Sequence, residues 1–257
     1  MLPVALTIAG SDPSGGAGIQ ADLKTFQRFG VYGEAAITLI TVQNTESVTR
    51  VETLGPDLVA QQIRAVVSDI PPRAAKTGAL GTAEIIDVVA GLAASFAFPL
   101  IVDPVMISKH GARLISADAE QVLKRKLLPH AFLLTPNIPE AEALTGMPIR
   151  GEEDMSRAAE RLLDFGCKGV LIKGGHLAGE PVDMLHWEGK QHVLNGARVH
   201  TIHTHGTGCT YSAAIAAGLA LEKDLLDAIS DAKQFIQRAI EQAPGLGQGI
   251  GPVNHLA

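Results

Sequence analysis

A thiol lies within a run of small residues near the end of the sequence. Residues 204–220 read THGTGCTYSAAIAAGLA, in which Gly206, Thr207 and Gly208 precede Cys209 and an alanine-rich stretch typical of a helix. The first N–H groups of a helix have no partners within it, and with the helix dipole they form an anion site. A helix start also lowers the pKa of a thiol. We therefore expect Cys209 to be substantially ionised near neutral pH, able to take a proton from an alcohol or to attack as a nucleophile.

Two further loops carry groups suited to metal and phosphate chemistry. Asp103 follows an apolar run in VDPVM, where a carboxylate can hold Mg²⁺, an ion that takes one or two protein carboxylates plus waters and phosphate oxygens. Lys173 ends the apolar run of VLIKGGHL and can reach a phosphate as a mobile point charge. TPNIPEAEAL places Asn137 and Glu140 at the start of a short helix. Glu140 is a candidate second metal carboxylate, although a glutamate there is common for dipole reasons alone.

Polar and glycine residues also follow the first two predicted strands. The stretch IAGSDPSGGAGIQADLKTF holds Gly-Gly-x-Gly, which is not the G-x-G-x-x-G pattern of dinucleotide-binding proteins. Its Asp12 and Asp22 favour a small polar ligand with donor groups, because ionised carboxylates only accept hydrogen bonds. Gln43 and Asn44 in LITVQNT offer amide groups that suit the edge of a nitrogen heterocycle, and an ordinary turn explains them equally well.

The composition limits the class of protein. The chain has 257 residues, of which 46% are hydrophobic and 19% charged, and its formal net charge is −6. This balance argues against a nucleic-acid partner, and no apolar run approaches the roughly 20 residues that cross a membrane. The two cysteines, Cys167 and Cys209, make no disulfide framework, which predicts a cytoplasmic protein. We expect Cys167, between a helix and a strand, to be a buried core residue.

Short apolar runs alternate with amphipathic segments along the chain. The predicted strands are Val4–Ala9, Ala35–Thr41, Ala74–Lys76, Pro99–Val102, Ala131–Leu134 and Gly169–Lys173. The predicted helices are Gly18–Arg28, Pro56–Ser68, Thr82–Ala94, Ala117–Leu127, Met155–Phe165, Gly208–Leu221 and Leu225–Ala243. Strands that are apolar on both faces indicate a parallel sheet covered by helices.

The segment Val182–Val199 differs from this alternation. It contains Glu188-Gly189 and Asn195-Gly196, which are turn signals, and so it predicts a small antiparallel excursion at the sheet edge. The whole predicts an α/β fold, residues 1–257 forming a single domain with a mostly parallel central sheet between two helical layers. Ligands of such sheets bind at the carboxyl ends of the strands, where the candidate residues lie.

A candidate metal carboxylate, a phosphate lysine and an anion-binding helix start together indicate phosphoryl transfer. The sequence lacks the G-x-x-x-x-G-K-[ST] motif of P-loop enzymes. It resembles the ribokinase-like superfamily, and within it the hydroxymethylpyrimidine/phosphomethylpyrimidine kinases of thiamine biosynthesis. The resemblance covers nearly the whole chain and is carried by IAGSDPSGGAGIQADLKTF, VQNT, VDPVM, TPNIPEAEAL, KGGH, THGTGCTYSAAIAA and GIGPVNH.

The resemblance implies a ribokinase-like three-layer α/β/α sandwich that uses ATP and Mg²⁺, and it suggests a homodimer. Most of the superfamily has Gly-Ala-Gly-Asp in the last loop with the aspartate as base, and Cys209 takes that position here. By the same resemblance the acceptor is a small pyrimidine, and it is phosphorylated on its hydroxymethyl group and then on the resulting phosphate.

Residue roles follow from the same resemblance. The pyrimidine pocket is expected to use Gln43, Gly10, Ala17, Asp22 and Val105; the Mg-ATP shell Asp103, Glu140 and Asn137; the nucleotide side Lys173 and Lys233; and the phosphoryl site Gly206, Thr207, Gly208 and Cys209. One departure is Ala79 in KTGAL, where the family often has methionine, so that one pocket wall is looser.

Three alternatives stay open on the sequence. A pyridoxal or pyridoxine kinase uses the same scaffold on a similar hydroxymethyl heterocycle. A thiol-nucleophile enzyme would use Cys209 with a histidine base, but nothing places His203 or His205 beside it. A non-catalytic sensor of a nucleotide or vitamin precursor would not need Asp103, Lys173 and Cys209 together.

Overall fold

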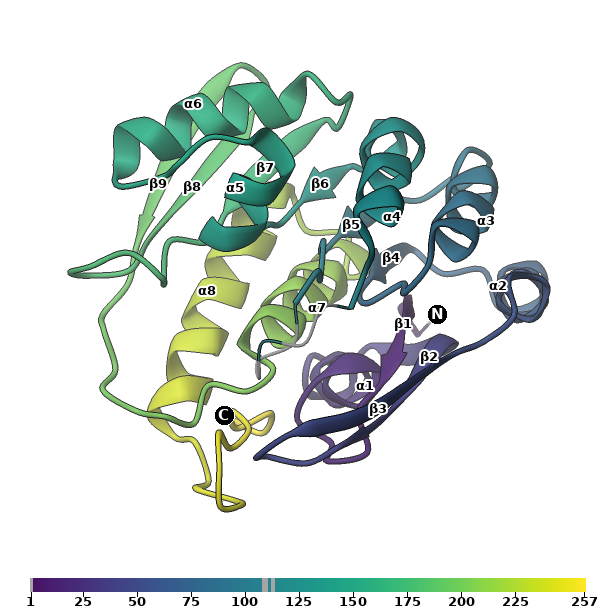
Figure 1. Cartoon of the computed structure of the whole chain (residues 1–257), viewed down its shortest axis with the longest axis horizontal. Coiled ribbons are helices and arrows are strands. Elements are labelled where there is room, and N and C mark those ends of the chain that lie inside the picture. Colours follow the sequence, from purple (N-terminus) through teal and green to yellow (C-terminus); the bar gives the residue numbers. More distant parts are fainter. Residues whose placement is uncertain (1, 108–110, 112–113) are drawn as a thin grey trace.

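The computed structural model describes residues 2–107, 111 and 114–257, which form a nine-stranded sheet in the order β3-β2-β1-β4-β5-β6-β7-β8-β9 (Figure 1). The strands are β1 (Val4–Ser11), β2 (Tyr32–Gln43), β3 (Val48–Thr53), β4 (Ala74–Thr77), β5 (Leu100–Val102), β6 (Leu133–Leu134), β7 (Gly169–Ile172), β8 (Val182–Trp187) and β9 (Lys190–Asn195). The central strands from β2 to β7 pair in parallel. At the two ends, β3, β8 and β9 pair antiparallel with their neighbours.

Helices cover both faces of the sheet. They are α1 (Gly18–Arg28), α2 (Pro56–Asp69), α3 (Ala83–Ala93), α4 (Ala117–Val122), α5 (Ile138–Thr145), α6 (Glu152–Leu163), α7 (Thr207–Ala220) and α8 (Leu225–Glu241). One apolar core joins the sheet to α2 through α6, and a second joins its other face to α1, α7 and α8. The predicted three-layer α/β/α sandwich is therefore confirmed. No helix in the described ranges is long and apolar enough to span a membrane.

Two features of the fold escaped the sequence patterns. The antiparallel excursion at β8 and β9 is confirmed, but β3 forms a second antiparallel edge that was not predicted. Its sequence VTRVET has no buried position, so no alternation of apolar residues marks it. The predicted helix Ala117–Leu127 is α-helical only to Val122, after which Leu123–Leu127 forms a π-helical turn.

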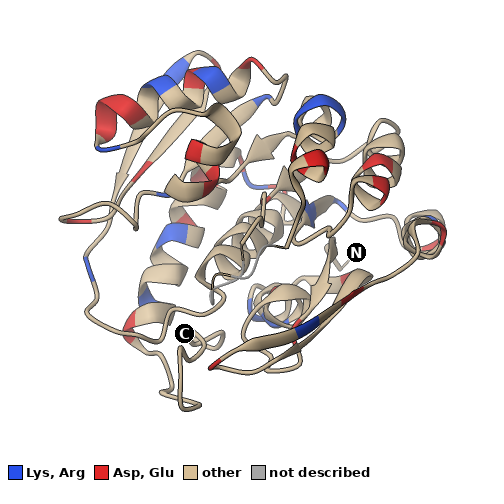
Figure 2. Ribbon diagram, viewed as in Figure 1, with Lys and Arg blue, Asp and Glu red and all other residues tan. Residues whose placement is uncertain are grey.

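Helix α7 is the most enclosed helix beside the sheet. All its residues from Thr210 to Ala220 are buried, and Figure 2 shows no charged residue along it. A helix that is apolar on all sides has to lie in the interior. It packs between α1, α8 and strands β1 and β4, and small residues permit the close approach. Its first turn is thereby fixed against the loops that follow the strands.

Glu34 on β2 provides a test of the packing away from those loops. The residue is 6% exposed, and its carboxyl oxygens have no hydrogen-bond partner among the described residues. Burial, with a smaller contribution from Asp69, raises the pKa of Glu34 from 4.5 to about 7. Between pH 4.5 and about 7 the unfolded chain ionises this group while the folded protein keeps it protonated. Stability is therefore lost as pH rises through this window.

We expect Glu34→Gln to stabilise the protein at pH 8 by about 1 kcal/mol or more, because the amide keeps the shape without the buried charge. The gain should be small near pH 4.5, where the folded carboxyl is protonated and the unfolded one is half protonated, and it should vanish at lower pH. Urea unfolding at pH 4.5, 6 and 8 measures it. The exposed Glu46→Gln is the matched control, and a gain independent of pH would contradict the argument.

Candidate active site

The two glycine-rich loops predicted from opposite ends of the chain lie against each other. Gly206 precedes α7 with a φ of 79°, and a Cβ added to it would lie 1.7 Å from the carbonyl oxygen of Gly16. Gly18 begins α1 with a φ of 57°, and a Cβ there would lie 2.3 Å from the carbonyl oxygen of Gly10. Only glycine permits contacts this close at such backbone angles. The loop after β1 and the loop before α7 therefore form one continuous surface.

Gly206→Ala is expected to destabilise the fold by about 3 kcal/mol or more, because the methyl group clashes with backbone and the backbone angle is strained. Gly91→Ala is the matched control. Gly91 lies within α3 with nothing near its added Cβ, so alanine there should stabilise the protein by roughly 0.5–1 kcal/mol. Thermal and urea unfolding of both variants measure the difference. Equal stabilities would mean that the two loops do not touch.

Asp103, Lys173 and the start of α7 meet at the ends of β5 and β7. The Lys173 ammonium donates to Asp103 Oδ1 at 3.0 Å, and the Ser212 hydroxyl donates to Oδ2 at 3.1 Å. A Cβ added to Gly208 would lie 3.4 Å from Lys173 Nζ. Burial alone would lower the pKa of Lys173, but the carboxylates of Asp103 and Glu140 outweigh it and raise the pKa. A fixed positive charge thus lies against the first turn of α7.

Asn137 and Glu140 lie next to this pair at the start of α5. The Asn137 side chain accepts the Glu140 backbone N–H at 3.0 Å, and the Glu140 carboxylate accepts the Asn137 N–H at 2.8 Å, which is a capping box. Burial raises the pKa of Glu140 to about 7, opposed by Lys173 and assisted by Asp103. Both residues therefore cap the start of α5. The Glu140 carboxyl also interacts through its charge with Lys173 and Asp103.

The two carboxylates fit a magnesium ion that arrives with phosphate. Within the described part of the chain, no three His, Cys, Asp or Glu side chains are grouped so as to hold a metal ion themselves. Mg²⁺ needs only one or two protein carboxylates, since waters and phosphate oxygens complete its shell. Each carboxylate of Asp103 and Glu140 has lone pairs beyond the bonds above. The donor set therefore suits a hydrated Mg²⁺ accompanying a nucleotide.

Cys209 lies in the first turn of α7 as predicted, but its thiol is not ionised. Burial raises the pKa of Cys209 to about 11, and the positive charge of Lys76 and the N–H of Gly18 offset this only in part. The expectation of a substantially ionised thiol near neutral pH is therefore wrong. Cys209 is partly exposed, but the surrounding protein keeps water from its sulfur. This loss of solvation disfavours the thiolate by more than the helix start favours it.

Asp22 lies beneath this surface. Its side chain is fully buried, Oδ1 accepts from the Lys76 ammonium at 3.0 Å and Oδ2 accepts from the Thr7 hydroxyl at 2.7 Å. Both oxygens thus bind the chain itself, where the sequence suggested donor groups of a ligand. Lys76 was not predicted as a site residue. Its signal in the sequence was a lysine inside the otherwise small and apolar strand β4.

Asp12 and His205 form a second buried pair that sequence reasoning missed. Asp12 Oδ1 accepts from the Ser14 backbone and hydroxyl, and Oδ2 accepts from the Ala17 N–H at 2.9 Å and from His205 Nε2 at 2.7 Å. Like Asp22, Asp12 therefore has its oxygens engaged within the chain. The Gln43 amide lies 3.1 Å from the same histidine nitrogen. The pair is 193 positions apart, so no local pattern could reveal it.

Three further residues were predicted to line the pyrimidine pocket, namely Ala17, Gly10 and Val105. Ala17 caps α1, and Gly10 is buried against Leu39. Val105 lines a small cavity together with Asp103. Their contacts with a substrate stay predictions.

Lys233 is engaged elsewhere. Its ammonium donates to Asp183 Oδ2 at 2.6 Å, and Asp183 Oδ1 accepts the backbone N–H of Gly174 at 3.0 Å. Through Asp183, Lys233 therefore holds Gly174, the residue that directly follows Lys173. The predicted contact of Lys233 with a nucleotide stays a prediction.

A parallel sheet with a buried lysine–carboxylate pair beside an anion-binding helix start is the arrangement of a ribokinase-like phosphotransferase. The chain belongs to the phosphomethylpyrimidine kinase family, whose model matches residues 12–254. A hydroxymethylpyrimidine/phosphomethylpyrimidine kinase of Synechococcus elongatus is 51% identical, over 99% of this chain and 98% of its own. A solved phosphomethylpyrimidine kinase of Clostridium difficile 630 is 46% identical with a TM-score of 0.82, covering 92% of this chain and 99% of its own. The predicted family, fold and enzyme class are thus confirmed.

The same scaffold also occurs in pyridoxal kinases. A structure of the Staphylococcus aureus pyridoxal kinase in complex with AMP-PCP and pyridoxal is 36% identical with a TM-score of 0.92, covering 100% of this chain and 94% of its own. Backbone similarity therefore does not separate the two activities, whereas sequence identity favours the pyrimidine kinases. Membership of a kinase family leaves the thiol-nucleophile and sensor alternatives without support.

Proposed function

We propose that this protein transfers the γ-phosphoryl group of ATP to 4-amino-5-hydroxymethyl-2-methylpyrimidine and then to the monophosphate, as a kinase of thiamine biosynthesis. The observation that carries the proposal is the Asp103–Lys173 pair set against the first turn of α7. A transferred phosphoryl group is an anion throughout its passage. Here a fixed ammonium and a helix start come together at the carboxyl ends of the strands.

Each part of the chain has a separate task in this proposal. The N–H groups of Gly206 and of the first turn of α7, at Thr207, Gly208 and Cys209, bind the transferred phosphoryl group, the Thr207 N–H also donating to the Thr204 carbonyl at 3.3 Å. Lys173 neutralises negative charge beside them. Asp103 and Glu140 would hold Mg²⁺ through its water shell, and the ion when bound neutralises phosphate charge. Gln43 binds the pyrimidine edge, at the end of β2.

Cys209 acts as the proton acceptor in the first step of this proposal. The positive charge of Lys76 and the N–H of Gly18 both lower the pKa of Cys209 and so favour the thiolate, although burial outweighs them. The thiolate form of Cys209, a minor species at neutral pH, takes the alcohol proton as the alcohol oxygen attacks the γ-phosphorus, and the bond from phosphorus to the oxygen of the departing ADP breaks. The monophosphate in the second step is mostly ionised at neutral pH and has no proton to give.

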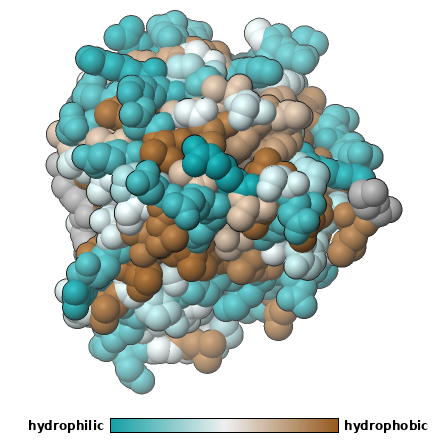
Figure 3. All heavy atoms as spheres, turned by 90° about the vertical axis from the view of Figure 1, so that its right-hand side faces the viewer, coloured by the Kyte–Doolittle hydropathy of each residue, from teal (hydrophilic) through white to brown (hydrophobic). Residues whose placement is uncertain are grey.

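The nucleotide, the location and the assembly are proposed on separate grounds. ATP is proposed because the similar pyridoxal kinase is in complex with AMP-PCP, an analogue of ATP. A cytoplasmic location is proposed from the two free cysteines. A homodimer is proposed because the apolar side chains of Tyr32, Ile40 and Val42 are exposed along β2, and hydrophobic atoms reach the surface in Figure 3.

Phosphate transfer from Mg-ATP to hydroxymethylpyrimidine, and then to its monophosphate, tests the function. The expected result is formation of both products, with pyridoxal as a poor competitor. Preferred turnover of pyridoxal would establish the alternative, a pyridoxal kinase, which has the same backbone. Turnover of neither compound would overturn the proposal.

A further inference from the structure

The Asp12–His205 pair takes no part in the phosphoryl transfer proposed above, yet it is buried and touches Gln43. Asp12 and His205 are each 3% exposed. His205 Nε2 lies 2.7 Å from an oxygen of Asp12 and 3.1 Å from the terminal nitrogen of the Gln43 amide. One ring nitrogen thus meets two polar groups, one from the loop after β1 and one from the end of β2.

The position of one proton follows from the short contact. Burial alone would raise the pKa of Asp12, but the donors from His205 and Ser14 outweigh it and lower the pKa. An ionised carboxylate only accepts hydrogen bonds, so His205 Nε2 has to carry the proton that joins them. A protonated Nε2 has no lone pair left to accept a hydrogen from an amide NH₂.

The same proton decides which end of the Gln43 amide faces the histidine. The oxygen and nitrogen of an amide have nearly the same shape, so the partner determines their placement. With the NH₂ towards His205, two donors would oppose each other in a buried place. With Oε1 towards His205, the Nε2–H of His205 is shared between the Asp12 carboxylate and the Gln43 amide oxygen, and two donors no longer face each other.

We propose that His205, held by Asp12, is a positioning residue that turns the oxygen of the Gln43 amide inward and presents its NH₂ group to the substrate. The inference rests on the proposed function, in which Gln43 binds the heterocycle. The ligand chemistry that this selects is a ring nitrogen with a free lone pair, as in a neutral aminopyrimidine. A ring nitrogen that carries a proton would meet a donor and be disfavoured.

The surrounding backbone holds both partners in place. The His205 N–H donates to the carbonyl of Gly251 at 3.0 Å, and the N–H of Ile250 donates to the carbonyl of Thr45 at 2.8 Å. A Cβ added to Gly249 would lie 2.1 Å from that same carbonyl. The glycine-rich segment before the C-terminus therefore clamps the turn after Gln43 and the histidine loop together. This gives the GIGPVNH stretch a task in orienting the amide.

Kinetics of variants at His205 separate positioning from structural support. His205→Phe removes the donor and should raise KM for hydroxymethylpyrimidine about 10-fold, the worth of one hydrogen bond, while kcat and KM for ATP change less than about twofold. His205→Gln restores an NH₂ near the Nε2 position and should return KM to within about threefold. Parallel losses in all three constants would show a structural role and overturn the inference.

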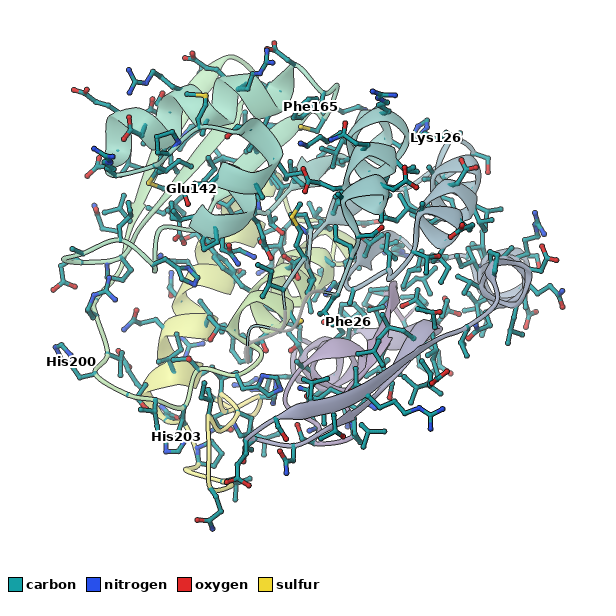
Figure 4. All side chains as sticks on the ribbon, in the orientation of Figure 1. Phe26, Lys126, Glu142, Phe165, His200 and His203 are labelled. Atoms are coloured by element: carbon teal, nitrogen blue, oxygen red, sulfur yellow. The ribbon has the colours of Figure 1, made fainter. Side chains whose placement is uncertain are left out.

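His203 supplies the matched control. It lies two residues earlier in the same loop, beside the C-terminal segment (Figure 4), and a Cβ on Gly251 would lie 2.5 Å from its Nδ1. No contact joins it to Asp12 or Gln43 among the described residues. His203→Gln should therefore leave KM for the pyrimidine within about twofold of the parent. A rise equal to that of His205→Phe would overturn the inference.

The ring ¹⁵N shifts of histidine-labelled protein test the proton directly. The His205 signals, assigned by their loss in His205→Gln, should show a protonated Nε2 at pH 7.5. An unprotonated Nε2 would overturn the inference even if the enzyme is fully active. Absence of pyrimidine phosphorylation by the parent protein would overturn the proposed function instead, and the shifts would still report the proton.

Discussion

Cys209→Ala is expected to slow phosphorylation of the hydroxymethyl group by about 10²-fold or more, because general-base assistance has at least that worth. Phosphorylation of the monophosphate should slow by less than about threefold, since its acceptor oxygen is already ionised. Single-turnover measurement of each step with saturating Mg-ATP checks the prediction. The comparison is internal, because both steps use the same loop, nucleotide and metal site.

The pH dependence of the first step should also show that Cys209 acts as a proton acceptor. Because the pKa of Cys209 is about 11, the thiolate is a minor species at neutral pH. Its population, and with it the rate of the first step, should rise about tenfold per pH unit between pH 7 and 9. The second step should be nearly flat over this range. Cys209→Ala should lose the slope as well as the rate.

The control for these measurements is the other cysteine. Cys167 is buried, and its thiol donates to the carbonyl of Leu162 at 3.4 Å within the core that includes α6. Cys167→Ala should cost stability by about 1 kcal/mol and leave both rates unchanged. Equal losses in both steps for Cys209→Ala would show that the residue shapes the anion site, and the assignment of a proton acceptor would be wrong.

The wrong expectation of a lowered pKa for Cys209 shows what a local sequence pattern cannot predict. The sequence correctly predicts a helix start at Cys209, and a helix start lowers the pKa of an exposed thiol. The pKa of Cys209 is decided by how deeply the protein, including α1 and β4, buries the sulfur. That burial depends on contacts such as those between α1 and α7, which no nearby residue encodes.

The strands and their loops were predictable for the opposite reason. Strands β1, β5 and β7 are apolar on both faces, and Asp103 and Lys173 directly follow two of them. Parallel strands bring such loops to one edge of a sheet, so these residues could be placed together. The pairing of Asp22 with Lys76, and of Asp12 with His205, was not predictable, because each pair forms across the fold and no local pattern identifies the partner.

Lys173→Met is expected to lower kcat/KM by about 10²–10³-fold in both phosphorylations. Its ammonium lies against the first turn of α7, where negative charge gathers in each step. Removal also leaves the carboxylate of Asp103, which is 2% exposed, with a hydroxyl as its remaining side-chain donor among the described residues. The stranded carboxylate repels the phosphates that the site has to bind. Steady-state kinetics with the pyrimidine and its monophosphate check the loss.

The pattern across the two steps separates this role from that of Cys209. A charge beside the phosphoryl group serves both acceptors alike, whereas a proton acceptor serves only the alcohol. Lys126→Met is the matched control, because Lys126 forms an exposed pair with Asp87 on the outer helices (Figure 4) and should change neither rate. Lys173→Arg should recover part of the activity, since it restores the charge in a different shape. Loss confined to the first step, or a fall in thermal stability with both rates intact, would exclude Lys173 from the phosphoryl site.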